Sequence, residues 1–147
     1  MKNIMEILET RVEKNKIIYD YCIKGDWKKI FEGKEKFSIE YNQDISAVPE
    51  SIAVIPLICN VLPIAWIYDA TIKVKSCDKS FIESIPEFKK GYINMYPTLK
   101  FKGSLEVENI KENTRENLKG AMTFFSGGVD AFSTLISHLD EKPTLIT

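Results

Sequence analysis

The pattern of apolar residues over 121–147 is the feature that most constrains the fold of this chain. Residues 121–125 are mostly apolar and predict a short strand, and Ser126-Gly127-Gly128 predicts a tight turn. Residues 129–139 follow helical spacing, and residues 144–147, which come after Pro143, predict a second strand. The apolar face of this helix is expected to consist of Phe132, Leu135, Ile136 and Leu139. A strand, a helix and a strand in this order predict a parallel βαβ unit.

The N-terminal part of the chain carries strand and helix patterns in mixed order. Residues 4–12 and 16–23 predict a hairpin, because the second run alternates and Asn15 in the joint between them tolerates a positive φ. The spacing of Ile4, Leu8 and Val12 would also suit a helix. Residues 37–41 alternate cleanly and predict another strand.

An uncharged run from Ile52 to Tyr68 is at the short limit for a membrane span and contains two prolines. A helix that begins near Pro49, bends at Pro56 and ends near Pro63 would account for the first part of this run. A strand over residues 64–74 would account for the rest. We therefore expect a buried helix and a buried strand in a soluble protein, and no membrane partner.

Two further elements and a boundary follow the apolar run. Asp78 is expected to cap a helix over residues 79–95 that Pro86 interrupts, and residues 101–107 alternate like a strand. Residues 108–119 are polar and almost free of apolar side chains. The sequence thus predicts an α/β protein in two parts, a mixed α+β module over residues 1–108 and a second domain over residues 120–147. A linker over residues 109–119 is expected to join them.

Composition excludes several broad classes of protein. With 44% hydrophobic residues the chain can build a core, so it is not intrinsically disordered, and a net charge of −1 gives no whole-chain attraction to nucleic acid. Three scattered cysteines without a CxxC pair indicate reduced thiols, so we expect no disulfide framework, no metal site and a cytoplasmic location. Cys59, in the apolar run, is expected in the core.

The turn at Ser126-Gly127-Gly128 has the geometry of a phosphate-binding loop. Two consecutive glycines allow a sharp turn and a close approach of the backbone to a ligand. The free N–H groups of the first helical turn, including that of Val129, favour an anion. Ser126 adds a hydroxyl donor, and the Asp130 carboxylate could serve a Mg²⁺ ion carried by the phosphates.

Residues Phe125-Ser126-Gly127-Gly128-Val129-Asp130 resemble the SGGxDS signature of the PP-loop ATP pyrophosphatases, which include 7-cyano-7-deazaguanine synthase. The resemblance implies an α/β fold, ATP and Mg²⁺ as ligands, and cleavage of ATP to AMP and pyrophosphate as an acceptor is adenylated. It implies that Ser126, Gly127, Gly128, Val129 and Asp130 line the phosphates and that the strand end near Leu145 and Ile146 approaches the adenine. The last serine of the signature is replaced by Ala131, which removes one phosphate-binding hydroxyl.

This resemblance covers only residues 121–147, so we expect the N-terminal fragment of an adenylating ligase or synthase. Such a fragment would bind nucleotide phosphates at most and would be inactive alone, and its acceptor, a small molecule or a macromolecule, is not specified by the sequence. The apolar faces of its short sheet would need a second copy or a missing C-terminal domain to cover them. The alternative is a non-catalytic interaction module with a relic phosphate loop.

Overall fold

The computed structural model of the protein describes residues 2–31, 36–113 and 121–146. The chain folds into two compact units, unit 1 over residues 1–113 and unit 2 over residues 114–147. Both units combine strands and helices, so the general α/β class is confirmed. Each unit is described by itself below.

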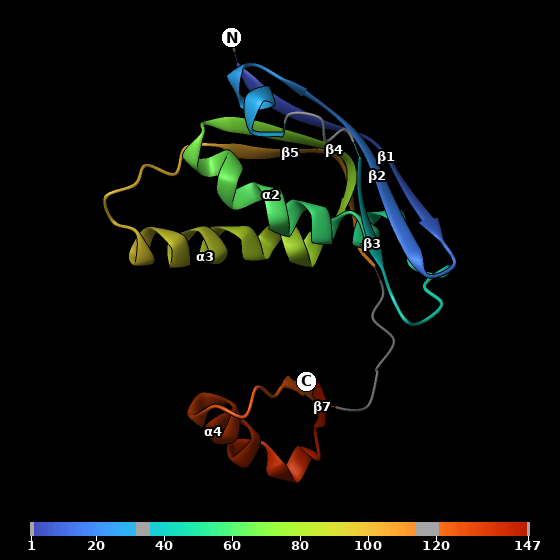
Figure 1. Cartoon of the computed structure of the whole chain (residues 1–147), viewed down its shortest axis with the longest axis vertical. Coiled ribbons are helices and arrows are strands. Elements are labelled where there is room, and N and C mark those ends of the chain that lie inside the picture. The colour runs from blue at the N-terminus through green and yellow to red at the C-terminus, as the bar shows by residue number, and fades with distance from the viewer. Residues whose placement is uncertain (1, 32–35, 114–120, 147) are drawn as a thin grey trace. The chain divides into compact units, whose positions relative to one another are not determined.

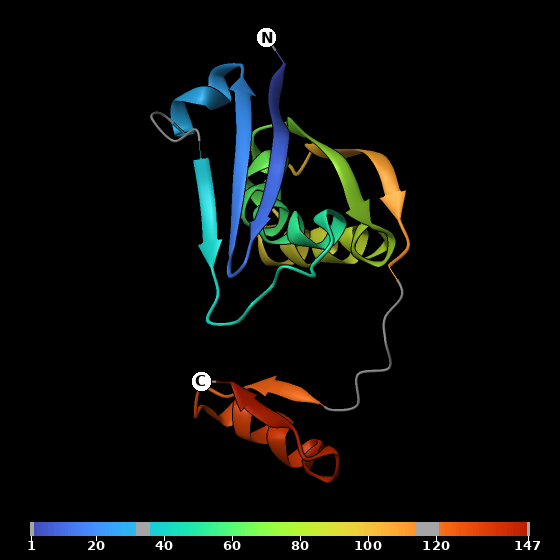
Figure 2. The ribbon, with the colours of Figure 1, turned by 90° about the vertical axis from the view of Figure 1, so that its right-hand side faces the viewer.

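Unit 1 is a twisted sheet with helices on one face (Figures 1 and 2). The strand order is β3-β2-β1-β4-β5, with antiparallel pairing among the first three strands and parallel pairing from β1 to β4 and from β4 to β5. The strands are β1 (Asn3–Glu13), β2 (Lys16–Lys24), β3 (Lys36–Glu40), β4 (Ala70–Asp78) and β5 (Ser104–Lys111). The helices are α1 (Glu50–Ala53), α2 (Ile55–Ile67) and α3 (Lys79–Met95), and a 3-10 helix, η1 (Asp26–Phe31), follows β2.

The predicted hairpin is confirmed as β1 and β2, although its turn differs in one detail. Lys14, rather than Asn15, adopts the positive φ, at 42°. The register shifts between Ile7 and Glu9, so Leu8 is an extra residue in β1. This bulge reverses the alternation, so that Ile7 faces the core before it and Val12, opposite Ile17, faces the core after it.

The core of unit 1 lies between the sheet and α2. On α2 the buried positions recur at helical spacing, and they are Leu57, Ile58, Val61, Leu62, Ala65 and Trp66. Both tryptophans are almost completely buried, Trp66 beneath α3 and Trp27 in η1. Tyr19 on β2 donates a hydrogen bond to the Ala53 carbonyl oxygen at 2.7 Å, which ties the sheet to α1.

The expected strand over residues 64–74 is wrong in its first half. The helix does not end near Pro63 but continues to Ile67, and the strand β4 begins at Ala70. Pro63 removes one helical hydrogen bond, yet Ala65 and Trp66 beyond it lie on the buried face of the continuing helix. Burial of these two side chains therefore outweighs the cost of the proline. Pro56 lies in the first turn of α2, where a proline is tolerated, and α1 ends just before it.

The stretch Glu50–Ile67 is long and apolar enough to cross a membrane by composition alone, but half of it is buried inside unit 1. Its buried side packs on β4. The expectation of a buried core helix is therefore confirmed for this segment.

Helix α3 begins and ends where the sequence predicts. The Asp78 carboxylate accepts a hydrogen bond from the Phe81 amide at 3.1 Å, as expected for a cap, and Asn113 donates to its other oxygen at 2.9 Å. The helix continues through Pro86, so the predicted interruption is wrong. Asn113 also donates to the Ser51 hydroxyl at 3.0 Å, and this network joins α1, α3 and the end of unit 1.

Replacing Asp78 with alanine is expected to lower the free energy of unfolding of unit 1 by about 1–2 kcal/mol at neutral pH, the usual cost of losing such a cap. The hydrogen bond from Asn113 is the main reason that the pKa of Asp78 is lowered below 3.8. The charged form is thus stabilised in the folded state, and its contribution is present above pH 3.8 and lost as pH falls through the lowered pKa. Urea unfolding of both proteins at several pH values should show their difference shrinking at acidic pH.

The last strand of unit 1 is displaced from its predicted position. It covers Ser104–Lys111 instead of residues 101–107, so residues 109–111, expected in a linker, continue the sheet beside β4. The remainder of that expected linker, from residue 114 on, lies outside the described residues.

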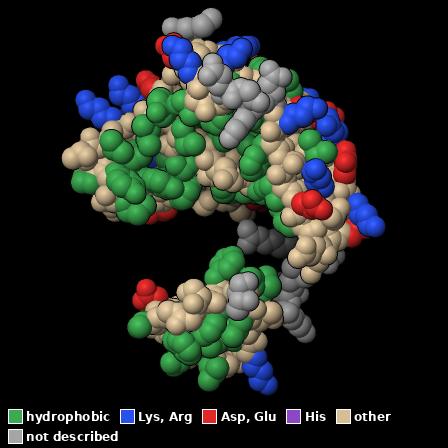
Figure 3. All heavy atoms as spheres, in the orientation of Figure 1, with side chains coloured by type: hydrophobic (Ala, Val, Ile, Leu, Met, Phe, Trp, Pro, Cys, Tyr) green, Lys and Arg blue, Asp and Glu red, His purple; other side chains and the backbone are tan. Residues whose placement is uncertain are grey.

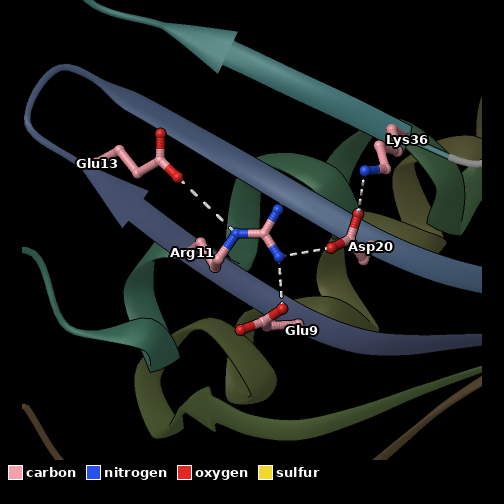
Figure 4. Close-up of polar contacts among 5 residues, drawn as sticks. All are labelled: Glu9, Arg11, Glu13, Asp20 and Lys36. Atoms are coloured by element: carbon pink, nitrogen blue, oxygen red, sulfur yellow. Dashed lines mark hydrogen bonds and ion pairs between the residues drawn. The ribbon is translucent and has the colours of Figure 1, made fainter.

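The face of the sheet opposite the helices carries ion pairs between neighbouring strands. Arg11 on β1 contacts Asp20 on β2 at 2.6 Å and also Glu9 on its own strand at 2.5 Å, and Lys36 on β3 lies 3.8 Å from Asp20 (Figure 4). Lys73 pairs with Glu106 in the same way, at 3.2 Å. Positive and negative side chains alternate across this face, which is typical of a solvated sheet surface.

Unit 2 contains the predicted βαβ unit. Its elements are β6 (Met122–Phe124), α4 (Val129–Ser137), a 3-10 turn, η2 (Leu139–Glu141), and β7 (Thr144–Ile146). The two strands pair in parallel, with Met122 opposite Thr144 and Phe124 opposite Ile146. The helix ends two residues earlier than expected, and Lys142 adopts a left-handed conformation after η2.

The expected apolar face of α4 is only partly covered. Leu135 and Ala131 are half-buried, whereas Phe132, Ile136 and Leu139 are exposed. One helix over two strands of three residues has too little surface opposite it to bury a full stripe, and the sheet residues Met122 and Phe124 are exposed as well. The exposure of three of the four predicted face residues therefore agrees with the expectation that so short a sheet leaves apolar faces uncovered.

Candidate functional site

The Ser126-Gly127-Gly128 turn lies between β6 and α4, at the carboxyl end of the parallel strand pair. The Phe125 amide donates to the Ile146 carbonyl at 2.8 Å, which places the end of β7 beside the start of the turn. Ligands of parallel α/β sheets bind outside the carboxyl ends of the strands. The turn thus occupies the edge where such a fold offers a binding site.

The two glycines of the turn have different roles. Gly127 adopts a φ of 76°, in the left-handed region that other residues occupy at a cost. Gly128 precedes the helix with φ −80° and ψ 166°, which any residue can adopt. A β-carbon at Gly128 would lie 3.6 Å from the Ser126 hydroxyl, an ordinary contact. The backbone therefore requires glycine at 127, whereas the absence of a side chain at 128 leaves space over the turn.

The N-terminus of α4 has exposed amides. Gly128 occupies the N-cap position of α4 and has no side chain that could accept from the first amides. The first N–H groups of a helix have no partner within the helix. Ser126, Gly127, Gly128, Val129 and Asp130 are all exposed. These amides and the helix dipole give the turn partial positive charge.

An open hollow lies beside the turn, along one side of α4. Its lining comprises Gly127, Val129, Phe132, Ser133, Ile136 and Ser137. The structure thus brings Gly127 and Val129 of the predicted site to the hollow, while Ser126, Gly128 and Asp130 are exposed outside its lining. The other four residues were not predicted as site residues, although Phe132 and Ile136 were expected on the apolar face of this helix and the spacing of all four places them on one side of it.

Charged side chains of unit 2 are arranged unevenly about the turn. Lys142 is the one lysine or arginine among residues 121–146, and it precedes β7, at the opposite end of the strand pair from the turn. His138 follows α4 and contacts Glu141 at 2.7 Å, so it also lies away from the turn. An anion at the turn would therefore be held by amides and hydroxyls, with Asp130 nearby as a possible partner for its counter-cation.

Neither a metal cluster among the described residues nor the buried thiol of Cys77 offers an alternative site. Within residues 2–31, 36–113 and 121–146, no three His, Cys, Asp or Glu side chains are grouped to hold a metal ion. Burial raises the pKa of the Cys77 thiol to about 11, so this thiol is protonated at neutral pH. Cys59, expected in the core, is exposed on α2, whereas Cys77 on β4 is buried.

Comparisons with family models, curated proteins and solved structures give no match for this chain. The candidate site is therefore interpreted from its residues and geometry.

Proposed function

We propose that the loop Ser126–Asp130 binds the phosphate groups of ATP with Mg²⁺, as in the PP-loop adenylating ligases and synthases that its sequence resembles. The observation that carries the proposal is the left-handed Gly127, which turns the chain from a parallel strand into an uncapped, exposed helix N-terminus. Unpaired, exposed amides at this edge of a sheet serve few structural purposes, whereas phosphate binding requires them.

The geometry supports the triphosphate part of the ligand more strongly than the rest. Amides at the start of α4 can donate to phosphate oxygens, and the Ser126 hydroxyl is exposed beside them. Each hydrogen bond to a charged group contributes about 1.5–3 kcal/mol. In an adenylating enzyme the held pyrophosphate leaves as an acceptor oxygen attacks the α-phosphorus.

A titration with Mg–ATP tests the proposal. We expect saturable binding with a dissociation constant of roughly 1 mM, since few donors face the ligand, and changes in the NMR shifts of the Gly127–Ala131 amides. Gly128→Val should abolish binding without unfolding the unit, because position 128 has a backbone conformation open to valine and its side chain would cover the amides. Gly91→Ala, on α3 in unit 1 with nothing near the added carbon, is the matched control and should bind as the wild type does.

Failure of the folded chain to bind Mg–ATP at several millimolar, or equal binding by Gly128→Val, would contradict the proposal. Release of AMP and pyrophosphate in the presence of an acceptor would extend it from binding to catalysis.

The exposed apolar residues of unit 2 favour a second candidate, an interaction module with a relic loop. Phe124 is 81% exposed and Val129 86% exposed, and such side chains commonly mark contact surfaces. Concentration-dependent self-association or capture of a partner, without any nucleotide binding, would favour this candidate.

A further inference from the structure

We propose that unit 1 binds the surface of an anionic lipid bilayer through one end of its helical layer. The surface, called here the lysine–aromatic patch, comprises residues 66–68 at the end of α2 and residues 88–103. The latter range covers the last part of α3 and its connection to β5. The proposal concerns peripheral binding, because the opposite side of α2 is buried in the core.

The patch itself contains only basic charges, although Asp69 and Glu87 border it in the sequence and Glu87 pairs with Lys90 at 3.4 Å. Residues 52–68 and 88–103 contain no aspartate or glutamate, although the chain has 21 acidic residues. The same two ranges contain four lysines, which are Lys89, Lys90, Lys100 and Lys102. Lys90, Lys100 and Lys102 are exposed. This part of unit 1 therefore attracts an anionic partner, in contrast to the alternating charges of the opposite sheet face.

An aromatic cluster holds the patch together. The Trp66 ring contacts Phe88, Tyr92 and Phe101, with ring centroids 5.6, 5.8 and 6.5 Å apart. The amide of Lys102 donates to the Trp66 carbonyl at 2.8 Å. The lysine at 89 lies over the Trp66 ring, with its Nζ 5.5 Å from the centroid. Residues from α2, α3 and the connection thus form one continuous and well-packed surface.

Large apolar side chains are exposed on the outside of this cluster. They are Ile67, Tyr68, Phe88, Ile93, Met95, Tyr96 and Leu99. Met95 is 62% exposed and Tyr96 51% exposed, both at the end of α3. Figure 3 shows hydrophobic side chains gathered over α2 and α3, with Lys or Arg side chains at the end of the layer where α3 connects to β5.

The composition of the patch fits a lipid surface better than a protein surface. Lysine is depleted at protein–protein interfaces, and four lysines supply the positive charge of the patch. Tyrosine is enriched at the membrane–water interface, and lysine stems lie along apolar surface while their charges reach anionic headgroups. Exposed apolar side chains beside a basic rim are typical of surfaces that insert shallowly into one leaflet.

Co-sedimentation of the full chain with vesicles tests this proposal. We expect binding to vesicles of phosphatidylcholine with phosphatidylserine at physiological ionic strength, and much weaker binding to phosphatidylcholine alone. The double variant Lys100→Glu, Lys102→Glu should weaken binding at least about thirtyfold, as expected when two lysines leave an anionic surface. Tyr96→Ser should weaken binding to the mixed vesicles without removing its dependence on phosphatidylserine.

The matched control is Lys28→Glu, Lys29→Glu, which makes the same charge change at exposed positions of η1 and should bind as the wild type does. Phe124→Ser tests whether the exposed side chains of unit 2 cause the vesicle binding instead. Absence of binding to the mixed vesicles, or an equal loss in either of these variants, would overturn the proposal. The chain could instead self-associate or bind an acidic polypeptide without binding vesicles. If the Lys100→Glu, Lys102→Glu variant abolished that interaction, the patch would have a protein partner, and the lipid proposal would be overturned as well. Unchanged thermal unfolding of each variant confirms that its fold is retained.

Discussion

Replacing Gly103 with alanine is expected to lower the free energy of unfolding of unit 1 by about 3 kcal/mol or more, at the upper end of the cost of overpacking. A β-carbon at this position would lie 2.5 Å from both the carbonyl carbon of Ala65 and the carbonyl oxygen of Ala70. Both are backbone atoms, so neither can rotate away. The Gly103 amide donates to the Trp66 carbonyl at 3.3 Å, which holds the start of β5 against the end of α2.

Gly91→Ala is the matched control for this prediction. Nothing lies within 4 Å of the added carbon, and alanine is favoured over glycine inside α3, so this change should stabilise the protein by about 0.5–1 kcal/mol. Both substitutions restrict the unfolded chain equally. The difference between their changes in the free energy of unfolding therefore reports the overlap of the added β-carbon at position 103 with the backbone of the folded state. Urea unfolding followed by tryptophan fluorescence measures it, since both tryptophans lie in unit 1. Equal stability of the two variants would contradict the close approach of α2 to β5.

Elements with a local signal could be predicted from the sequence. The cap at Asp78 fixes the start of α3, and its hydrogen bond to Phe81 lies within four residues of chain. The same holds for Gly127, whose left-handed conformation follows from the turn itself. The order of strand, turn, helix and strand in unit 2 was predictable for this reason.

Elements that depend on distant packing could not be predicted so well. The residues over 52–68 are almost all apolar, so their pattern shows neither a helical nor a strand period. Only packing against β4 shows that Trp66 belongs to a helix and that Cys59 lies on its exposed side. The spacing of Ile4, Leu8 and Val12 suits a helix, but Leu8 is exposed at the bulge in β1 and only Val12 of the three packs against the core. The exposure of Ile136 depends on what covers α4, which local sequence does not determine.

Replacing Ala131 with serine is expected to tighten the binding of Mg–ATP by about tenfold or more, if the loop binds phosphates as proposed. Serine restores the hydroxyl that the PP-loop signature carries at this position, and one hydrogen bond to a charged group contributes about 1.5–3 kcal/mol. Ala131 lies in the first turn of α4 and is half-buried, so the small side chain of serine fits there. Calorimetric titration of both proteins with Mg–ATP measures the change.

Two further variants separate this hydroxyl from other contributions. Ser133→Ala should leave the affinity unchanged, because Ser133 lies beyond the first turn of α4, whose amides are proposed to hold the phosphates, and a large loss would instead show that it replaces the missing serine. The gain from Ala131→Ser should disappear in the Gly128→Val background, since the two changes act on one bound phosphate and are coupled. An equal gain in that background would show that serine acts on the stability of α4. No gain in either background would mean that residue 131 does not face the nucleotide.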